Sequence, residues 1–159
     1  MAEPVLTALA IAAIAGTGLN AGLFFAFSNF VMAALARAGQ ARGMAAIQAI
    51  NITVLNPLFM LVFFGTGLLS LAVALAAVLP WGGEPAWTAL IAAVLYNVGC
   101  VGVTLRCNVP LNNALAQADA KVPASADLWA RYLREWTMWN HVRTIASLAA
   151  SVLLVLSIL

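Results

Sequence analysis

The sequence predicts an all-α fold, an integral membrane four-helix bundle in a single domain over residues 1–159. Of the 159 residues, 65% are hydrophobic and 8% are charged, whereas soluble domains have roughly 25% charged residues. A soluble chain of this size could not hide so much apolar surface in its own core, so lipid is the expected solvent. Apolar stretches long enough to cross a bilayer, about 20 residues each, occur four times.

The apolar stretches predict spans at residues 5–35, 47–79, 86–105 and 140–159. They are long and do not alternate, unlike the strands of a membrane β-barrel. Inside the second stretch, Pro57 removes a backbone hydrogen bond and predicts a kink after Asn56. Such a kink can be a plain bend in the helix or can shape a ligand pocket, and both interpretations stay open.

The connections between the spans differ sharply in charge. Residues 36–46 and 106–139 form two loops that contain or directly precede all seven basic residues, whereas the turn at 80–85 has one acid and no base. Loops rich in Lys and Arg stay in the cytoplasm. The sequence therefore predicts cytoplasmic basic loops with both termini outside, in the cell inner membrane if the protein is bacterial.

The loop at 106–139 is expected to be largely helical. Asn108 can cap a helix and Pro110 is tolerated in a first turn, which predicts a short interfacial helix over about 109–118. Aromatic residues then recur every three or four positions and predict a helix over about 127–139 that leads directly into the fourth span. These residues are Trp129, Tyr132, Trp136 and Trp139.

Polar side chains gather in the cytoplasmic half of the predicted bundle. Because an unpaired polar group in hydrocarbon is costly, they need partners or a cavity. For any single Asn, a hydrogen bond between helices is the simpler interpretation. Their accumulation at one depth favours a site. The set includes Ser28, Asn51, Asn56, Asn97, Thr104, Arg106, Asn108, Asn112, Asn140, His141 and Arg143, together with Asn20, Asn29, Gln48, Thr53, Tyr96, Asn113 and Thr144.

Helical spacing predicts which polar residues face the same way. Asn97 and Thr104, seven apart, are expected on one face. On the fourth span Asn140 and Arg143 share a stripe, whereas His141 lies nearly opposite Arg143, so these two cannot both face the bundle axis.

His141 is the only histidine. It can be a structural hydrogen-bonding residue, a general base near neutral pH or an axial haem ligand. No metal site is predicted, because the five acids lie outside the spans and one chain cannot supply two His and a carboxylate. The net charge of +2, without a long basic run, predicts no nucleic-acid partner.

Across nearly its whole length the sequence resembles the anthrone-oxygenase-like family of small four-helix membrane proteins. The last two of the matching motifs are the specific ones. The motifs are GLFFAFS at 22–28, QAIN at 48–51, NP at 56–57, RCNVPLN at 106–112 and WTMWNHVRT at 136–144.

The resemblance implies that some members oxidise polycyclic phenolic anthrones to anthraquinones with O2. The expected function is therefore a membrane-embedded oxygenase that acts on a lipophilic, anthrone-like aromatic molecule at a polar pocket on the cytoplasmic side. Expected catalytic residues are His141, Arg143, Asn140 and Asn108. Expected cofactor contacts are His141 and Arg106, and expected substrate contacts are Asn51, Asn56, Ser28, Asn112, Trp136 and Trp139. A haem held by His141 and cofactor-free oxygenation both stay open.

Two other functions stay open. The chain can be a non-catalytic membrane protein that binds haem or a lipophilic ligand, or an assembly protein whose Asn residues join helices. Its many Gly and Ala residues allow close helix packing and are compatible with a homo-oligomer, but they do not set a subunit number.

Overall fold

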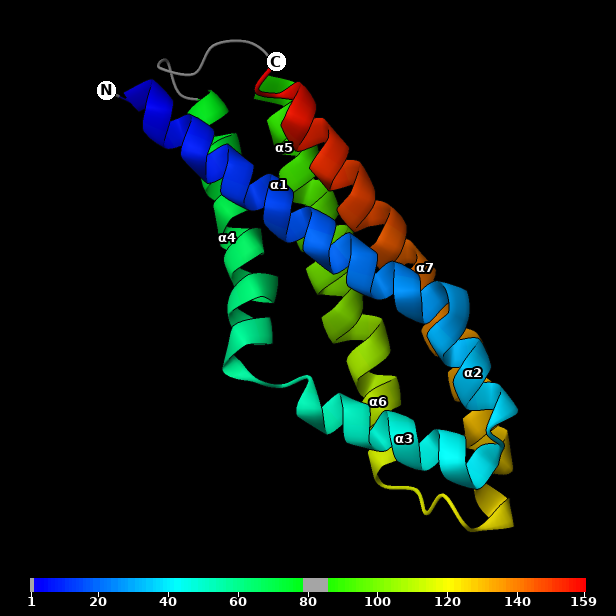
Figure 1. Ribbon diagram of the computed structural model, residues 1–159. Coiled ribbons are helices and arrows are strands. Elements are labelled where there is room, and N and C mark those ends of the chain that lie inside the picture. Colours follow the sequence, from blue (N-terminus) through cyan, green and yellow to red (C-terminus); the bar gives the residue numbers. More distant parts are fainter. Residues whose placement is uncertain (1, 79–85) are drawn as a thin grey trace.

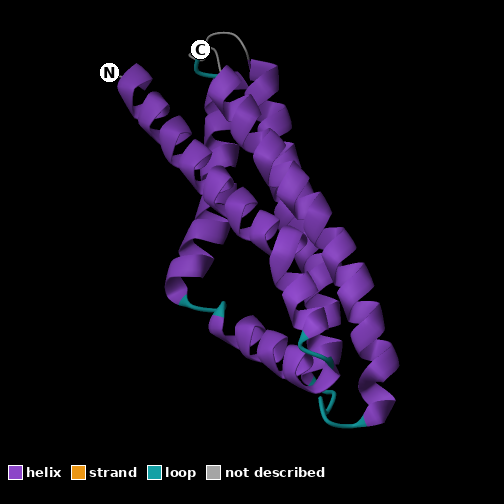
Figure 2. Ribbon diagram, turned by 45° about the vertical axis from the view of Figure 1, so that its right-hand side comes forward, coloured by secondary structure: helices purple, strands orange, loops and turns teal. Residues whose placement is uncertain are grey.

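The computed structural model describes residues 2–78 and 86–159 (Figures 1 and 2). It confirms the predicted all-α membrane bundle. The helical stretches that are long and apolar enough to cross a membrane are Pro4–Arg37, Pro57–Val78, Trp87–Ala116 and Pro123–Leu156. The turn predicted at 80–85 lies outside the described residues.

The first and last helical stretches pack side by side along the molecule (Figure 1). The first consists of α1 (Ala2–Ala26), a π-helical turn η1 (Phe27–Val31) and α2 (Met32–Arg37). The last is α7 (Ala126–Leu156), preceded by the short 3-10 turn η4 (Pro123–Ser125). The predicted helical lead-in to the fourth span is therefore present. At about 1.5 Å per residue α7 is about 46 Å long, so it extends beyond a hydrocarbon core of about 30 Å.

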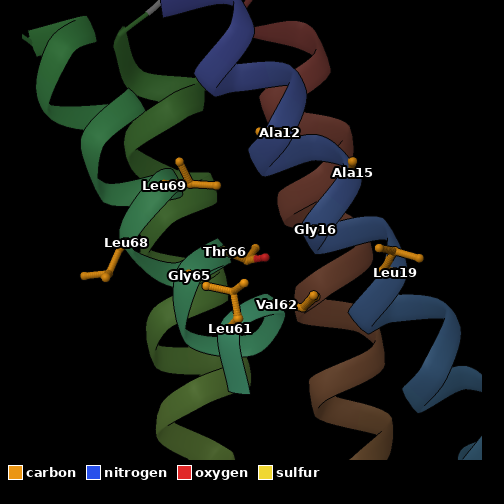
Figure 3. A pocket seen from close by; sticks show the side chains of 10 residues that line it. All are labelled: Ala12, Ala15, Gly16, Leu19, Leu61, Val62, Gly65, Thr66, Leu68 and Leu69. Atoms are coloured by element: carbon orange, nitrogen blue, oxygen red, sulfur yellow. The ribbon is translucent and has the colours of Figure 1, made fainter. Parts of the chain in front are cut away.

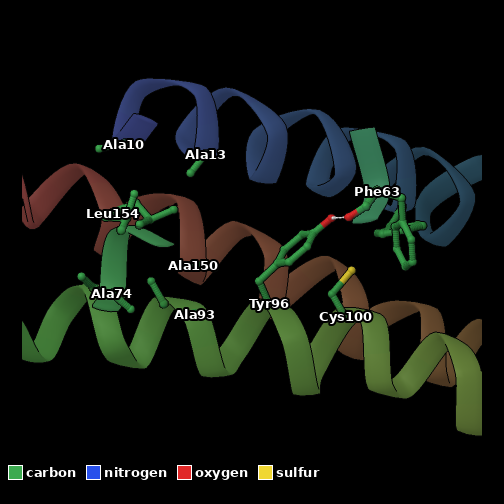
Figure 4. Packing of buried hydrophobic residues seen from close by; sticks show 13 residues of the cluster. Ala10, Ala13, Phe63, Ala74, Ala93, Tyr96, Cys100, Ala150 and Leu154 are labelled. Atoms are coloured by element: carbon green, nitrogen blue, oxygen red, sulfur yellow. Dashed lines mark hydrogen bonds between the residues drawn. The ribbon is translucent and has the colours of Figure 1, made fainter. Parts of the chain in front are cut away.

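The core within the membrane is built largely from small residues. Ala13, Ala92 and Ala150 are fully buried where α1, α5 (Ala86–Val94) and α7 meet, and side chains of this size let helix backbones approach closely. The Tyr96 hydroxyl donates a 2.9 Å hydrogen bond to the Phe63 carbonyl, as Figure 4 shows. This bond joins the third span to the second inside the core.

The second predicted span, 47–79, is not one helix. Three residues separate the end of helix α3 (Gln40–Thr53) from the start of α4 (Pro57–Val78). Asn56 Oδ1 accepts a 3.0 Å hydrogen bond from the Phe59 amide, so Asn56 caps α4 and Pro57 occupies its first turn. The predicted kink is therefore a helix start, and α3 lies across the end of the bundle (Figure 1).

Helix α3 docks through a second hydrophobic core. Met44 and Ile47 are fully buried and belong to the same cluster as Leu115, Trp129 and Tyr132. The Gln48 amide also donates to the carbonyls of Leu115 at 2.7 Å and Ala118 at 3.0 Å. The Leu115 carbonyl belongs to the last turn of α6 (Val109–Ala116) and that of Ala118 follows it, so both bonds fasten α3 to the end of α6.

The third span is longer than predicted and contains π-helical turns. It runs from α5 through η2 (Leu95–Gly102) and η3 (Thr104–Asn108) into α6 (Val109–Ala116). The predicted short helix is present as α6, but it continues the span and Asn108 makes no side-chain cap.

The π turns also explain why Asn97 and Thr104 do not share partners. Asn97 bonds to Ser70 on α4, whereas Thr104 meets Arg143 on α7. A π turn contains more residues than an α turn, so seven-residue spacing no longer returns to the same face.

Gly39 joins α2 to α3 in a backbone conformation, φ 83° and ψ 164°, that is essentially restricted to glycine. We expect Gly39→Ala to lower the free energy of unfolding by about 1–3 kcal/mol, as measured by thermal or denaturant unfolding in detergent. Gly22→Ala is the matched control, because Gly22 lies within α1 and an added Cβ there meets nothing within 4 Å. Equal stability of the two variants would contradict the backbone argument.

Candidate functional site

A cavity of about 330 Å³ lies where the two hydrophobic cores meet. Its wall combines aromatic rings with polar side chains from α1, α3, α4, α6 and α7. Such a mixture is typical of small-molecule sites. The lining residues are Leu23, Phe24, Phe27, Gln48, Ile50, Asn51, Ile52, Val54, Leu55, Phe59, Phe63, Thr104, Val109, Asn112, Asn113, Ala116, Trp136 and Arg143.

Arg143 is the only ionisable side chain in the described cavity wall, and it is 5% exposed. Its Nη2 donates to Asn140 Oδ1 at 2.6 Å and its Nη1 to Thr104 Oγ1 at 3.2 Å. The guanidinium carbon lies 4.2 Å from the Phe24 ring centroid and 5.0 Å from that of Trp136. These rings contribute cation–π attraction to the buried charge.

Among the described residues, no carboxylate forms an ion pair with Arg143. Within the described part of the chain, the ion pairs join Glu135 to Arg131 and Arg134, outside the cavity. Burying a cation without a counter-ion is costly, and hydrogen bonds to neutral acceptors offset that cost only in part. An anionic group bound in the cavity would supply the missing counter-charge.

Asn140 positions Arg143 and also joins α7 to the first span. Its Nδ2 donates to the Phe24 carbonyl and to Ser28 Oγ, both at 2.7 Å. Its Oδ1 is then free to accept from Arg143, one turn later on the same helix face. The predicted stripe of polar residues on the fourth span therefore serves one connected network.

At another part of the wall, three helices meet through a tyrosine. The Tyr132 hydroxyl of α7 donates to Asn112 Oδ1 of α6 at 2.9 Å and accepts from Asn51 Nδ2 of α3 at 3.3 Å. The Tyr132 ring stacks on Trp136, with centroids 5.9 Å apart. Asn108 supports the same region, because its Nδ2 donates to the Trp136 carbonyl at 3.1 Å.

The residues predicted from the sequence fall into three groups. Asn51, Asn112, Trp136 and Arg143 line the cavity. Asn108 and Asn140 lie behind its wall and bond to the backbone of lining residues, and Ser28 bonds in turn to Asn140. Asn56, Arg106, Trp139 and His141 are not in the lining.

The residues outside the lining have other surroundings. Asn56 caps α4, and Trp139 packs against the second core. Arg106 and His141 are exposed. His141 and Arg143 therefore do lie on opposite faces of α7, as helical spacing predicts, and it is Arg143 that faces inward.

Sequence reasoning missed the contribution of α4 to the cavity. Phe59 and Phe63, one turn apart, line it and stack with centroids 5.5 Å apart. Two features of the sequence could have identified this contribution. The pair Asn56-Pro57 is compatible with a helix start, and Phe59 and Phe63 follow it four positions apart, on one helix face.

A larger hollow, about 630 Å³, lies between α1 and α4 (Figure 3). Small and aliphatic residues line it, and Thr66 is the polar side chain among them. Without a set of polar groups to orient a ligand, this hollow offers no chemistry and is suited to contact with lipid tails.

The described residues contain no group of three or more His, Cys, Asp or Glu side chains that could hold a metal ion. The cavity also does not fit a haem held by His141, because this imidazole is exposed and is not part of the cavity wall. Axial ligation needs an imidazole directed at the bound iron.

Comparisons with known proteins returned no match among curated proteins or solved structures. The family model described as anthrone oxygenase matches residues 59–153, which is more than half of the chain. The matched segment contains Phe59, Phe63, Thr104, Trp136 and Arg143 of the cavity wall. The chain therefore belongs to the anthrone oxygenase family.

Proposed function

We propose that this protein is a membrane-embedded oxygenase that acts with O2 on a lipophilic, anthrone-like aromatic molecule bound in the cavity. The observation that carries the proposal is the buried Arg143 cation, which has no carboxylate partner in the part of the chain that the structure describes and lies against aromatic rings. Phe24, Phe59 and Trp136 provide faces for a flat ring system. The guanidinium provides the charge that stabilises its deprotonated oxygen.

The proposed reaction needs only substrate and O2. Loss of a proton from the anthrone methylene forms an enolate, whose negative oxygen pairs with Arg143. The enolate carbon transfers an electron to O2, and the two radicals combine into a carbon–oxygen bond. The protonated hydroperoxide then loses water, which leaves a quinone carbonyl. One oxygen atom enters the product, the other leaves as water, and the methylene supplies both electron pairs.

Each nearby residue has a defined role in this proposal. Arg143 binds the enolate oxygen and makes deprotonation easier by stabilising its product. Asn140 and Thr104 hold the guanidinium in place. No His, Asp, Glu, Cys or Tyr belongs to the described lining, so we propose that the proton leaves to water.

The test is O2 uptake by purified protein in detergent or nanodiscs with anthrone as substrate, with anthraquinone formation followed in parallel. We expect His141→Ala to retain kcat/KM within about twofold, because an exposed residue contributes little. We also expect no intense absorption band near 400 nm in the wild-type protein purified from haem-replete cells. A band that His141→Ala removes would instead establish a haem protein and overturn the cofactor-free mechanism.

One observation favours a second candidate, a carrier that binds the aromatic ligand without turnover. The described lining has no residue that acts as a general base near neutral pH. This candidate predicts stoichiometric ligand binding that depends on Arg143, with O2 uptake no faster than that of anthrone in protein-free micelles.

We also propose that the cavity end of the molecule faces the cytoplasm. Helix α3 and the connection between α6 and α7 lie at the end opposite both termini (Figure 1), and basic residues are concentrated there. Under the positive-inside rule, this arrangement supports an orientation with both termini outside. Labelling of single cysteines introduced beside Arg42 and near the C-terminus, with a membrane-impermeant maleimide, tests the orientation.

A further inference from the structure

The cavity has two polar regions separated by an aromatic face. Arg143 forms one, and the side chains that surround the Tyr132 hydroxyl form the other. Trp136 lies between them. Its ring is 5.0 Å from the guanidinium carbon and 5.9 Å from the Tyr132 ring centroid. A fused polycyclic aromatic molecule lying along Trp136 has the length to reach both regions.

The bonds of Tyr132 leave specific atoms available to a ligand. The Tyr132 hydroxyl donates a hydrogen bond to Asn112 Oδ1 and accepts one from Asn51 Nδ2. These two hydrogen bonds orient both side-chain amides, and they use the oxygen of Asn112 and the nitrogen of Asn51. The other ends, the acceptor Asn51 Oδ1 and the donor Asn112 Nδ2, make no hydrogen bond among the described residues, and both side chains line the cavity. A neighbouring acceptor and donor match a hydroxyl group, which can donate to one and accept from the other.

We propose that Asn51 and Asn112 recognise a ligand hydroxyl remote from the oxygen that Arg143 binds, and that Tyr132 is the positioning residue that orients them. The aromatic nature of the ligand rests on the proposed function, but the hydroxyl recognition rests on this cluster alone. Because Asn51, Asn112 and Tyr132 come from α3, α6 and α7, the site exists only when α3 is docked across the end of the bundle.

The experiment compares two product-like probes, anthraquinone and a hydroxyanthraquinone with its hydroxyl at a β position. Their dissociation constants are measured by tryptophan fluorescence quenching in nanodiscs. Wild-type protein is expected to bind the hydroxylated probe about tenfold more tightly, which corresponds to the net worth of a well-positioned hydrogen bond. Tyr132→Phe keeps the ring, releases both amides and is expected to reduce this preference to about twofold or less.

Tyr96→Phe is the matched control. It also removes a buried phenolic hydroxyl that bonds within the protein, but in the membrane core and not in the cavity wall. It is expected to keep the tenfold preference. If Tyr132→Phe does not fold, Asn51→Leu removes the acceptor directly, and its loss of the preference supports hydroxyl recognition, whereas a retained preference overturns it.

The outcomes separate this proposal from the proposed function. Equal affinity of the wild-type protein for both probes overturns hydroxyl recognition, even if anthrone turnover is observed. Equal weakening of both probes by Tyr132→Phe means a purely structural role and overturns the positioning assignment. Discrimination between the probes without any O2 uptake on anthrone supports hydroxyl recognition and overturns the oxygenase proposal instead.

Discussion

Arg143→Met is expected to lower kcat/KM for anthrone oxidation by about 100-fold or more, because loss of a donor to a developing oxyanion costs this much in other enzymes. Methionine fills similar space without charge. Removing the buried cation relieves a desolvation cost, whereas Asn140 Oδ1 loses its partner. These effects oppose each other, so the thermal unfolding midpoint is expected to change little.

The measurements for this variant are O2 uptake and circular dichroism melting on the same preparation. Arg106→Met is the control, because Arg106 is an exposed arginine outside the cavity wall. Full activity of Arg143→Met would contradict the anion-binding role of Arg143. A collapse in stability with little activity left would show that the arginine is mainly structural.

Thr104→Asp is expected to reduce binding of an anionic ligand, such as an anthraquinone phenolate, by about 10- to 100-fold, because the new carboxylate takes the place of the ligand as counter-ion to Arg143. Thr104 Oγ1 lies 3.2 Å from Arg143 Nη1 and lines the cavity. Since the buried cation gains a partner, the protein is expected to remain folded.

The matched variant for this prediction is Thr104→Asn, which has nearly the same shape without the charge. It is expected to bind this ligand within about threefold of the wild type, because one neutral acceptor for the guanidinium replaces another. Equal effects of Asp and Asn would mean that shape at this position matters and charge does not. The quantity to measure is the dissociation constant of an anthraquinone phenolate, with kcat/KM for anthrone as a second readout, because the enolate forms only in the cavity.

The sequence was sufficient to predict the fold class and the composition of part of the site. Hydrophobicity acts locally and adds along the chain, so apolar runs of sufficient length identify membrane helices wherever the helices finally pack. Helical spacing was equally sufficient on α7, where Asn140 and Arg143 share a face and His141 is opposite, because this helix is regular throughout.

Local sequence patterns were not sufficient to predict the backbone where the same residues are compatible with two conformations. Asn56-Pro57 is compatible with a kinked helix and with a helix start. Docking of α3 decides between them, since Gln48 reaches the end of α6 and Met44 and Ile47 fill the second core. The π turns in the third span likewise depend on packing, and they turn Thr104 toward Arg143 while Asn97 faces α4.

The sequence by itself determined that this protein is a helical membrane bundle with polar groups concentrated toward one end, because these properties follow from composition and spacing along the chain. Only the tertiary structure decided that Arg143 and not His141 faces the cavity. Either face of α7 could have turned inward by spacing alone. The inward face is the one whose Asn140 bonds to the Phe24 carbonyl and Ser28 on the neighbouring span, which are contacts between residues far apart in the sequence.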